Sequence, residues 1–159
     1  KGFVFDGRIA EDFKLSTGTW VHVGELRRAI IARFAPLLRD AVIAGHDRDE
    51  VAVLLVPDPE ACRRASGDPS ASARVLLRST ALRHILQEHL DRLAESASGS
   101  SQRVARAILL EEPPSIDANE VTDKGSINQR AVLARRADLV AELYTEPYSP
   151  RVLIAAAGR

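Results

Sequence analysis

Apolar residues along the chain recur with two periods, which separate the expected helices from the expected strands. Leu26, Ile30 and Phe34 share one helical face, and a longer stripe of leucines follows after residue 80. Asp58 is a candidate N-cap, and Ser126 and Gln129 have the spacing of a capping box. These patterns predict helices at residues 25–34, 59–64, 80–94 and 126–144. Short apolar runs bounded by polar turns predict strands at residues 40–45, 50–56 and 103–110.

The remaining segments are expected to be turns and loops. The first 23 residues alternate short β-like runs with Gly7 and Gly18, which predicts a hairpin or a looped strand pair. Residues 66–72 and 96–101 are polar and lack apolar anchors, so they are expected to be mobile. The apolar run at residues 152–154 leaves open whether the tail docks on the core. The order of elements predicts an α+β fold, a small mixed sheet with packed helices preceded by a short strand pair.

Composition narrows the class of protein. The chain has 159 residues, the size of one domain. Its 22 basic and 22 acidic residues balance, which argues against a dedicated nucleic-acid-binding protein, and its longest apolar runs are too short to span a bilayer. The single Cys62 excludes an internal disulfide and favours a reducing, cytoplasmic compartment. Because methionine is absent, we expect the chain to be a piece of a longer protein.

Few residue types are available for catalysis. The chain has 19 arginines but only three lysines, Lys1, Lys14 and Lys124. It contains no phosphate-binding glycine loop, no dinucleotide fingerprint, no nucleophile elbow and no zinc-protease helix motif. His84 and His89 are five positions apart on one expected helix and point roughly 140° apart, so no metal site is expected.

Two loops combine glycine with charged residues in a way that suggests a binding or catalytic role. In the first loop, Arg8 follows a glycine and is followed by an acidic pair. Gly18, which has no side chain, would allow another group to approach the backbone closely. The second presents Lys124 at the tip of a loop, just before the last expected helix. From spacing alone, both loops are also compatible with surface turns whose charges are solvated.

These loops resemble motifs of one enzyme superfamily. Gly7-Arg8, the acidic pair, Lys14, Gly18 and Glu25-Leu26 resemble the hinge motif that opens the C-terminal domain of adenylate-forming enzymes. That superfamily includes acyl-CoA synthetases, peptide-synthetase adenylation domains and luciferases. Residues 37–57 are similar to the stretch that follows the family's first helix, and residues 122–130 fall where the family carries its final threonine-glycine-lysine motif. The amino-acid sequences of residues 5–15 and 122–130 are most similar to those of the feruloyl-CoA synthetase branch.

The resemblance implies a mobile lid, residues 1–159, acting on a large N-terminal domain of the same enzyme. In such enzymes an aromatic or fatty carboxylic acid reacts with ATP and Mg²⁺ to give an acyl-adenylate and pyrophosphate, and CoA then gives the thioester and AMP. The resemblance assigns the adenylation lysine to Lys124, in a loop at residues 119–128. It places Arg8 near the ribose and phosphates, and Gly18 with Trp20 beside the CoA channel. The hinge falls near residues 8–12.

Two departures from the family pattern leave alternatives open. The usual motif has lysine directly after the glycine, a position held here by Ser126, which is expected to cap the last helix. One extra residue stands between Arg8 and Gly18, so the hinge residue is either Glu11 or Ala10. Trp20 is also compatible with a place in a small core. The alternative functions are an adenylation domain that loads a carrier protein, and a non-catalytic α+β interaction module.

Overall fold

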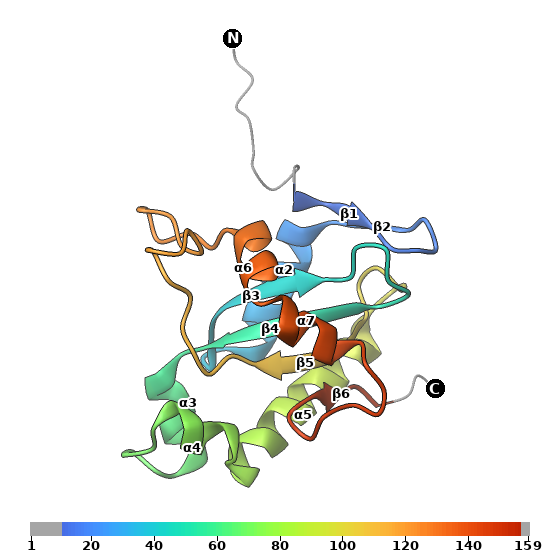
Figure 1. Ribbon diagram of the computed structural model, residues 1–159. Coiled ribbons are helices and arrows are strands. Elements are labelled where there is room, and N and C mark those ends of the chain that lie inside the picture. Colours follow the sequence, from blue (N-terminus) through green and yellow to red (C-terminus); the bar gives the residue numbers. More distant parts are fainter. Residues whose placement is uncertain (1–10, 157–159) are drawn as a thin grey trace.

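The structure is a computed structural model that describes residues 11–156. It confirms the predicted α+β class, with two small sheets and helices packed around the larger one (Figure 1). In chain order, the elements are β1 (Phe13–Lys14), β2 (Trp20–Val21), α2 (Val23–Phe34), β3 (Leu38–Ala44), β4 (Val51–Pro57), α3 (Pro59–Ser66), α4 (Ala73–Leu77), α5 (Thr80–Ser96), β5 (Val104–Leu109), α6 (Gln129–Arg135), α7 (Ala137–Leu143) and β6 (Leu153–Ile154).

The larger sheet has the order β3-β4-β5-β6 and mixes strand directions. β3 and β4 form an antiparallel hairpin, β4 and β5 are parallel, and β6 pairs antiparallel with β5. The parallel pair requires a long crossover, which α3, α4 and α5 supply. The short apolar run of the tail therefore does dock on the core, as the edge strand β6.

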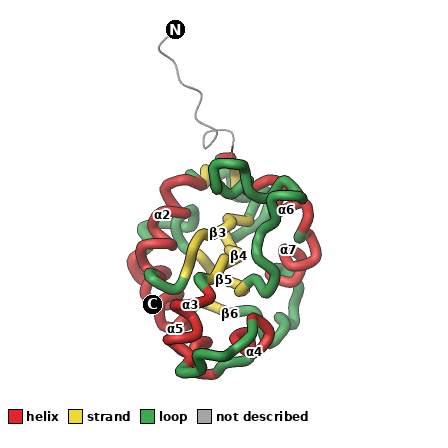
Figure 2. The backbone as a smooth tube through the Cα atoms, turned by 90° about the vertical axis from the view of Figure 1, so that its left-hand side faces the viewer, coloured by secondary structure: helices red, strands yellow, loops and turns green. Residues whose placement is uncertain are grey.

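Helices cover both faces of this sheet. Viewed end-on in Figure 2, α2 and α5 lie on one side of the strands and α6 and α7 on the other. Side chains alternate accordingly along β4: Val51, Val53 and Leu55 join the core under α2 and α5, whereas Ala52 and Leu54 join the core under α6 and α7. A strand buried on both faces is apolar throughout, which explains why this run is unbroken.

Three of the four predicted helices form, with longer bounds than expected: α2, α3 and α5. The side chain of Asp58 accepts a hydrogen bond from Ala61 N at 3.1 Å and caps α3, which ends at Gly67 with φ 79°. Ser79 caps α5 through Leu82 N at 3.1 Å. Between them lies α4, a short helix that the sequence pattern did not predict. Among residues 11–156, no helix is long and apolar enough to cross a membrane.

The prediction of one helix over residues 126–144 is wrong, because two short helices meet at Arg136. The capping box is wrong as well: Asn128 is the N-cap, and its side chain accepts a hydrogen bond from Ala131 N at 3.2 Å. The amide of Gln129 turns instead to the free edge of β3. There it accepts from Ile43 N at 2.9 Å and donates to Ala41 O at 3.0 Å, so it pairs with the strand as another strand would.

One polar segment is better anchored than its composition suggests. Within residues 66–72, Ala71 is buried, and its carbonyl accepts a hydrogen bond from Arg63 Nε at 2.9 Å. The expectation that this segment lacks an apolar anchor is therefore wrong at Ala71. The mobility of both polar segments stays a prediction.

Candidate functional site

The first candidate loop is the turn between β1 and β2. Leu15 N donates to Thr19 O at 2.9 Å, and Gly18 N donates to Leu15 O at 2.8 Å. Gly18 has φ +91°, a left-handed conformation that favours glycine. A Cβ built on Gly18 meets nothing within 4 Å among the described residues, so the turn needs this glycine for its backbone angle. The expected close approach of another group therefore does not come from residues 11–156 of this chain.

The first hairpin, residues 13–21, is fixed to the turn between β3 and β4. Ser16 N donates to Arg48 O at 2.8 Å, and the Ser16 hydroxyl donates to Asp49. Asp47 N donates back to Lys14 O at 3.2 Å. Backbone bonds thus run in both directions between the two turns, and the first hairpin is held as part of the domain.

Trp20 lies on the open face of this hairpin. Its side chain is 51% exposed, so the alternative that it packs in a small core is wrong. Lys14 pairs with Trp20 across the hairpin, and the Lys14 ammonium lies 5.4 Å from the centre of the indole ring. The first hairpin thus carries an exposed indole, a cation beside it and a glycine with open space around it.

The hinge motif is described only in part, because Arg8 and Ala10 lie outside residues 11–156. Glu11 is half-buried at the start of the described chain. Asp12, the second member of the acidic pair, accepts a hydrogen bond from Val23 N at 2.9 Å, and its carboxylate lies 3.1 Å from His22 Nδ1. The side chain of Asp12, 11 residues earlier in the sequence, thus caps the first turn of α2, because the N-cap residue His22 makes no side-chain cap bond. Asp12 therefore belongs to the folded body, through its bonds to the start of α2.

The second candidate loop is a hairpin of the same kind. Val121 and Ile127 form an isolated antiparallel bridge. Inside it, Thr122 N donates to Ser126 O at 2.8 Å and Gly125 N donates to Thr122 O at 2.9 Å, with Gly125 at φ +85°. Lys124 is exposed at the tip, as predicted for a loop lysine.

Ser126 does not cap a helix, contrary to the expectation. It lies in this hairpin, two residues before the true N-cap, and its N–H donates to the Thr122 hydroxyl at 3.1 Å.

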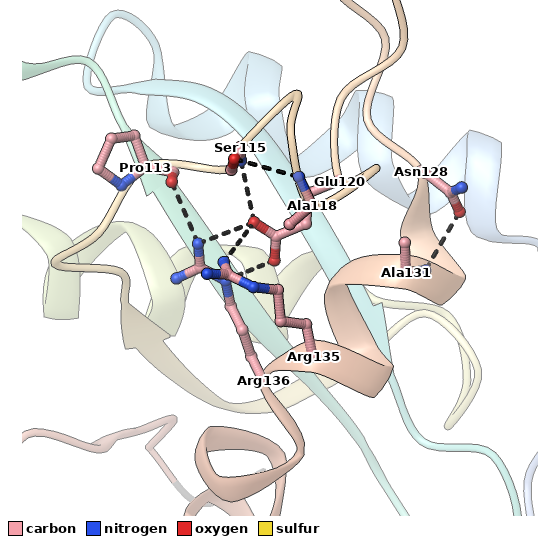
Figure 3. Close-up of polar contacts among 8 residues, drawn as sticks. All are labelled: Pro113, Ser115, Ala118, Glu120, Asn128, Ala131, Arg135 and Arg136. Carbon is pink, nitrogen blue, oxygen red and sulfur yellow. Dashed lines mark hydrogen bonds and ion pairs between the residues drawn. The ribbon is translucent and has the colours of Figure 1, made fainter.

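At the base of the lysine loop, residues 119–128, lies a buried ion-pair cluster (Figure 3). The Glu120 carboxylate is fully buried. Its Oε2 accepts from Arg136 Nε at 2.8 Å, and its Oε1 accepts from Arg136 at 3.1 Å, from Arg135 at 3.0 Å and from Ser115 N at 2.9 Å. The hydrogen bonds from Arg136 lower the pKa of Glu120 against the opposing effect of burial.

Sequence reasoning missed this cluster. Its only signals were an acid near the start of the loop and the adjacent pair Arg135 and Arg136, 15 and 16 positions later. Nothing in that spacing distinguishes a buried carboxylate from a solvated one.

A cavity of about 380 Å³ lies against the lysine loop. Val121, Gly125 and Ile127 form one wall. The floor is at the carboxyl ends of the parallel strands β4 and β5, near Val56 and Leu109. Crevices at this end of parallel strands commonly hold ligands. In this domain, the cavity leaves open space next to the lysine loop.

Two other chemistries find no support among the described residues. Between residues 11 and 156, no group of three or more His, Cys, Asp and Glu side chains is arranged to hold a metal. Cys62 is buried, and burial raises the pKa of its thiol to about 11, so it is not a nucleophile at neutral pH.

A match to a family model shows the class of protein, the C-terminal domain of an AMP-binding, adenylate-forming enzyme. Residues 12–147 match the family model described as the AMP-binding enzyme C-terminal domain, and the chain belongs to that family. The superfamily resemblance is thereby confirmed.

The chain spans about a fifth of the length of the proteins that it matches. The chain is 26% identical over 142 residues to the chloroplastic long-chain-fatty-acid–[acyl-carrier-protein] ligase AEE15 of Arabidopsis thaliana, covering 89% of this chain but only 18% of that protein. The adenylation domain of a carboxylic acid reductase from Mycobacterium chelonae shares the fold with a TM-score of 0.64 and 23% identity, over 86% of this chain and 20% of that one. The A-PCP didomain of carboxylic acid reductase from Segniliparus rugosus, solved with AMP, matches with a TM-score of 0.61 and 24% identity, over 84% and 17%.

Proposed function

We propose that this chain, residues 1–159, is the mobile C-terminal domain of a longer ATP-dependent ligase. That ligase activates an aromatic or fatty carboxylic acid and transfers it to a thiol. The observation that carries the proposal is the pair of exposed glycine hairpins, one with Gly18 and Trp20 and the other with Lys124. They project from separate parts of the domain, at the right and the left of Figure 1. We infer that each completes a different site on a second domain.

The lysine loop fits the first half-reaction. A carboxylate oxygen attacks the α-phosphorus of ATP, and the bond to pyrophosphate breaks. Negative charge develops on the phosphate oxygens and on the leaving group, and an ammonium group stabilises it. Lys124 is exposed at the tip of a hairpin, so its ammonium is able to enter a site built by another domain. ATP and its Mg²⁺ are held mainly by that domain, with Arg8 near the ribose and phosphates.

The first hairpin fits the second half-reaction. The thiol attacks the acyl carbonyl, the bond to AMP breaks, and the thiol proton is lost to solvent or base. The thiol arrives on a long phosphopantetheine arm, which needs an open channel. Gly18 is open on its outer side and Trp20 is half-exposed beside it. A rotation about Glu11 or Ala10 would exchange the two hairpins at the site, as lid movements do in other enzymes.

Two thiol carriers use the same arm. The amino-acid sequences of residues 5–15 and 122–130 favour CoA as the thiol and an acid of the kind that feruloyl-CoA synthetases activate. The relative's name, a ligase for an acyl-carrier protein, and the A-PCP didomain favour a carrier protein as the alternative. A free, buried Cys62 is compatible with a cytoplasmic enzyme.

Substitutions that separate the half-reactions test this proposal in the full-length ligase. Lys124→Ala should reduce ATP–pyrophosphate exchange by on the order of 10²–10³-fold while thioester formation from supplied acyl-adenylate stays within about 2-fold. Trp20→Ala and Gly18→Leu should do the reverse. Arg92→Ala, an exposed cation on α5, is the matched control and should leave both steps unchanged.

The outcomes are separable. If Lys124→Ala leaves pyrophosphate exchange unchanged, the lysine assignment is wrong. Giving the acyl-adenylate either CoA or a holo carrier protein as acceptor decides between the two thiols.

A further inference from the structure

We propose that Glu120, through its buried ion pair with Arg136, is the positioning residue of the lysine loop: it holds Lys124 in the place that adenylation requires. The proposal rests on the function proposed above for Lys124. It assigns no contact between Glu120 and the substrate. Glu120 acts through the backbone of the hairpin that it anchors.

The apolar packing of the lysine loop is limited to its base, where the partly buried Ile127 packs against the core under α6 and α7. Three of its residues, Val121, Gly125 and Ile127, border the 380 Å³ cavity, and Lys124 is exposed at the tip. A segment next to a cavity loses the dispersion contacts that fix buried elements. The internal hydrogen bonds of the hairpin set its shape, but they do not set its direction relative to the sheet.

That direction is set at the base of the loop, where Glu120 joins both of its ends. Glu120 N donates to Ser115 O at 2.9 Å, and Asn128 N donates to Glu120 O at 2.8 Å. Its neighbour Asn119 has φ +63°, so the chain turns sharply into the loop. The residue that enters the loop and the residue that leaves it therefore meet at Glu120.

The side chain then fastens this base to the helices. Arg136 stands at the break between α6 and α7, and besides its two bonds to Glu120 it donates to Pro113 O at 3.1 Å. Arg135 adds a further bond from a half-exposed position. One guanidinium thus ties together the incoming loop, the lysine hairpin and the helix pair, as Figure 3 shows.

A buried ion pair is a weak source of net stability compared with apolar side chains of the same volume, and its best-attested use is to specify one geometry. The two-bond contact between Arg136 and Glu120 allows one orientation. A displacement of a catalytic group by about 1 Å can cost roughly 10²-fold in rate. A selective loss in the lysine-dependent step therefore separates a positioning role from a purely structural one.

The test compares Glu120→Gln with Glu142→Gln in the full-length ligase. Glu142 is the matched control: on α7 it accepts bonds from Arg151 at 2.8 Å and from Ser149, and the bond from Arg151 lowers its pKa, but it is remote in sequence from the lysine loop. Glu120→Gln should lower kcat of pyrophosphate exchange by roughly 10- to 100-fold. KM for ATP and thioester formation from supplied acyl-adenylate should stay within about 2-fold, and Glu142→Gln should leave all three unchanged.

Amide hydrogen exchange gives the structural readout. In Glu120→Gln the amides of Thr122 and Gly125 should lose protection while those of β4 keep it. Arg135→Gln, which removes a half-exposed donor and so leaves the fold intact, should show the same pattern with a smaller loss.

Either of two results overturns the positioning role: equal losses in both half-reactions, or unchanged pyrophosphate exchange in both Glu120→Gln and Arg135→Gln while Lys124→Ala abolishes it. If Lys124→Ala itself has no effect, the proposed function fails first, and the exchange data alone then decide whether Glu120 fixes the loop.

Discussion

The turn at residues 15–19 and the turn at residues 122–126 have the same backbone design but different anchors. Each is closed by a glycine N–H that donates to a carbonyl three residues earlier, and the glycines have φ +91° and +85°. The first turn begins at the buried Leu15 and is bonded to the β3–β4 turn through backbone groups. The second begins beyond Glu120 and depends on a buried ion pair.

This difference shows that turn chemistry and turn placement are separate problems. Glycine in the left-handed region determines the local shape in both cases. Packing and backbone bonds place the first hairpin, with one added bond from the Ser16 hydroxyl to Asp49, so its position should depend less on charge. A carboxylate places the second, so its position should depend on one protonation state and on one arginine.

The largest difference in the free energy of unfolding is expected between variants that remove the arginine partner of Glu120 and the arginine partner of Glu142. Arg136→Leu leaves the Glu120 carboxylate buried with half of its bonds, and it should lower the free energy of unfolding by about 3–5 kcal/mol. Arg151→Leu removes an equally well-formed bond to Glu142, but that arginine side chain is 45% exposed, so the loss should be about 1 kcal/mol or less. Urea denaturation measures both, and equal losses would show that Glu120 is not the special site described here.

The sequence predicted the elements whose causes are local. The spacing of Leu26, Ile30 and Phe34 predicted α2, and Asp58 before Pro59 predicted the start of α3. The mixed sheet followed from the order of these elements. Short β-like runs and glycine predicted the first hairpin. The second region was expected only to be a loop, and the structure shows that it is also a hairpin.

The sequence did not predict the features that depend on distant partners. Gln129 was read as a capping residue because its true partners, Ala41 and Ile43, are 88 and 86 residues away. The helix breaks at Arg136, whose side chain binds Glu120 across 16 positions. Such contacts leave no periodic signal, so the positions of the hairpins were predictable from sequence and their anchors were not.

A medium effect is expected from crowding the first hairpin. A Cβ on Gly45 would lie 3.2 Å from Glu50 O, 3.2 Å from the Phe13 ring and 3.3 Å from Leu15, at φ +146°. Gly45→Ala should therefore destabilise the domain by about 1–3 kcal/mol. It should expose the amides of the first hairpin to hydrogen exchange while the lysine loop keeps its protection.

Gly99→Ala is the control for that experiment, since a Cβ there meets nothing within 4 Å; its effect should stay within about 0.5 kcal/mol. If Gly45→Ala loosens both hairpins equally, the two anchors are not independent.

The smallest effect is expected from acid. Hydrogen bonds from Arg136 lower the pKa of Glu120 in the folded protein, whereas an unfolded glutamate titrates near pH ~4.3. The folded state then binds fewer protons than the unfolded state, so the contribution of Glu120 to stability is present above the unfolded pKa and is lost as the pH falls through the folded pKa. Glu142, whose pKa is also lowered, contributes in the same direction.

Global denaturation between pH 6 and pH 3 therefore reports both carboxylates, and local hydrogen exchange is needed to separate them. With falling pH, after correction for the intrinsic exchange rate, protection at Thr122 and Gly125 should decrease before protection at Leu15 and Ser16. Glu120→Gln should remove this order, because the glutamine has no proton to gain, whereas Glu142→Gln should preserve it. If both hairpins lose protection together in the unsubstituted protein, the lysine loop is held by packing after all, and the contrast between the two anchors fails.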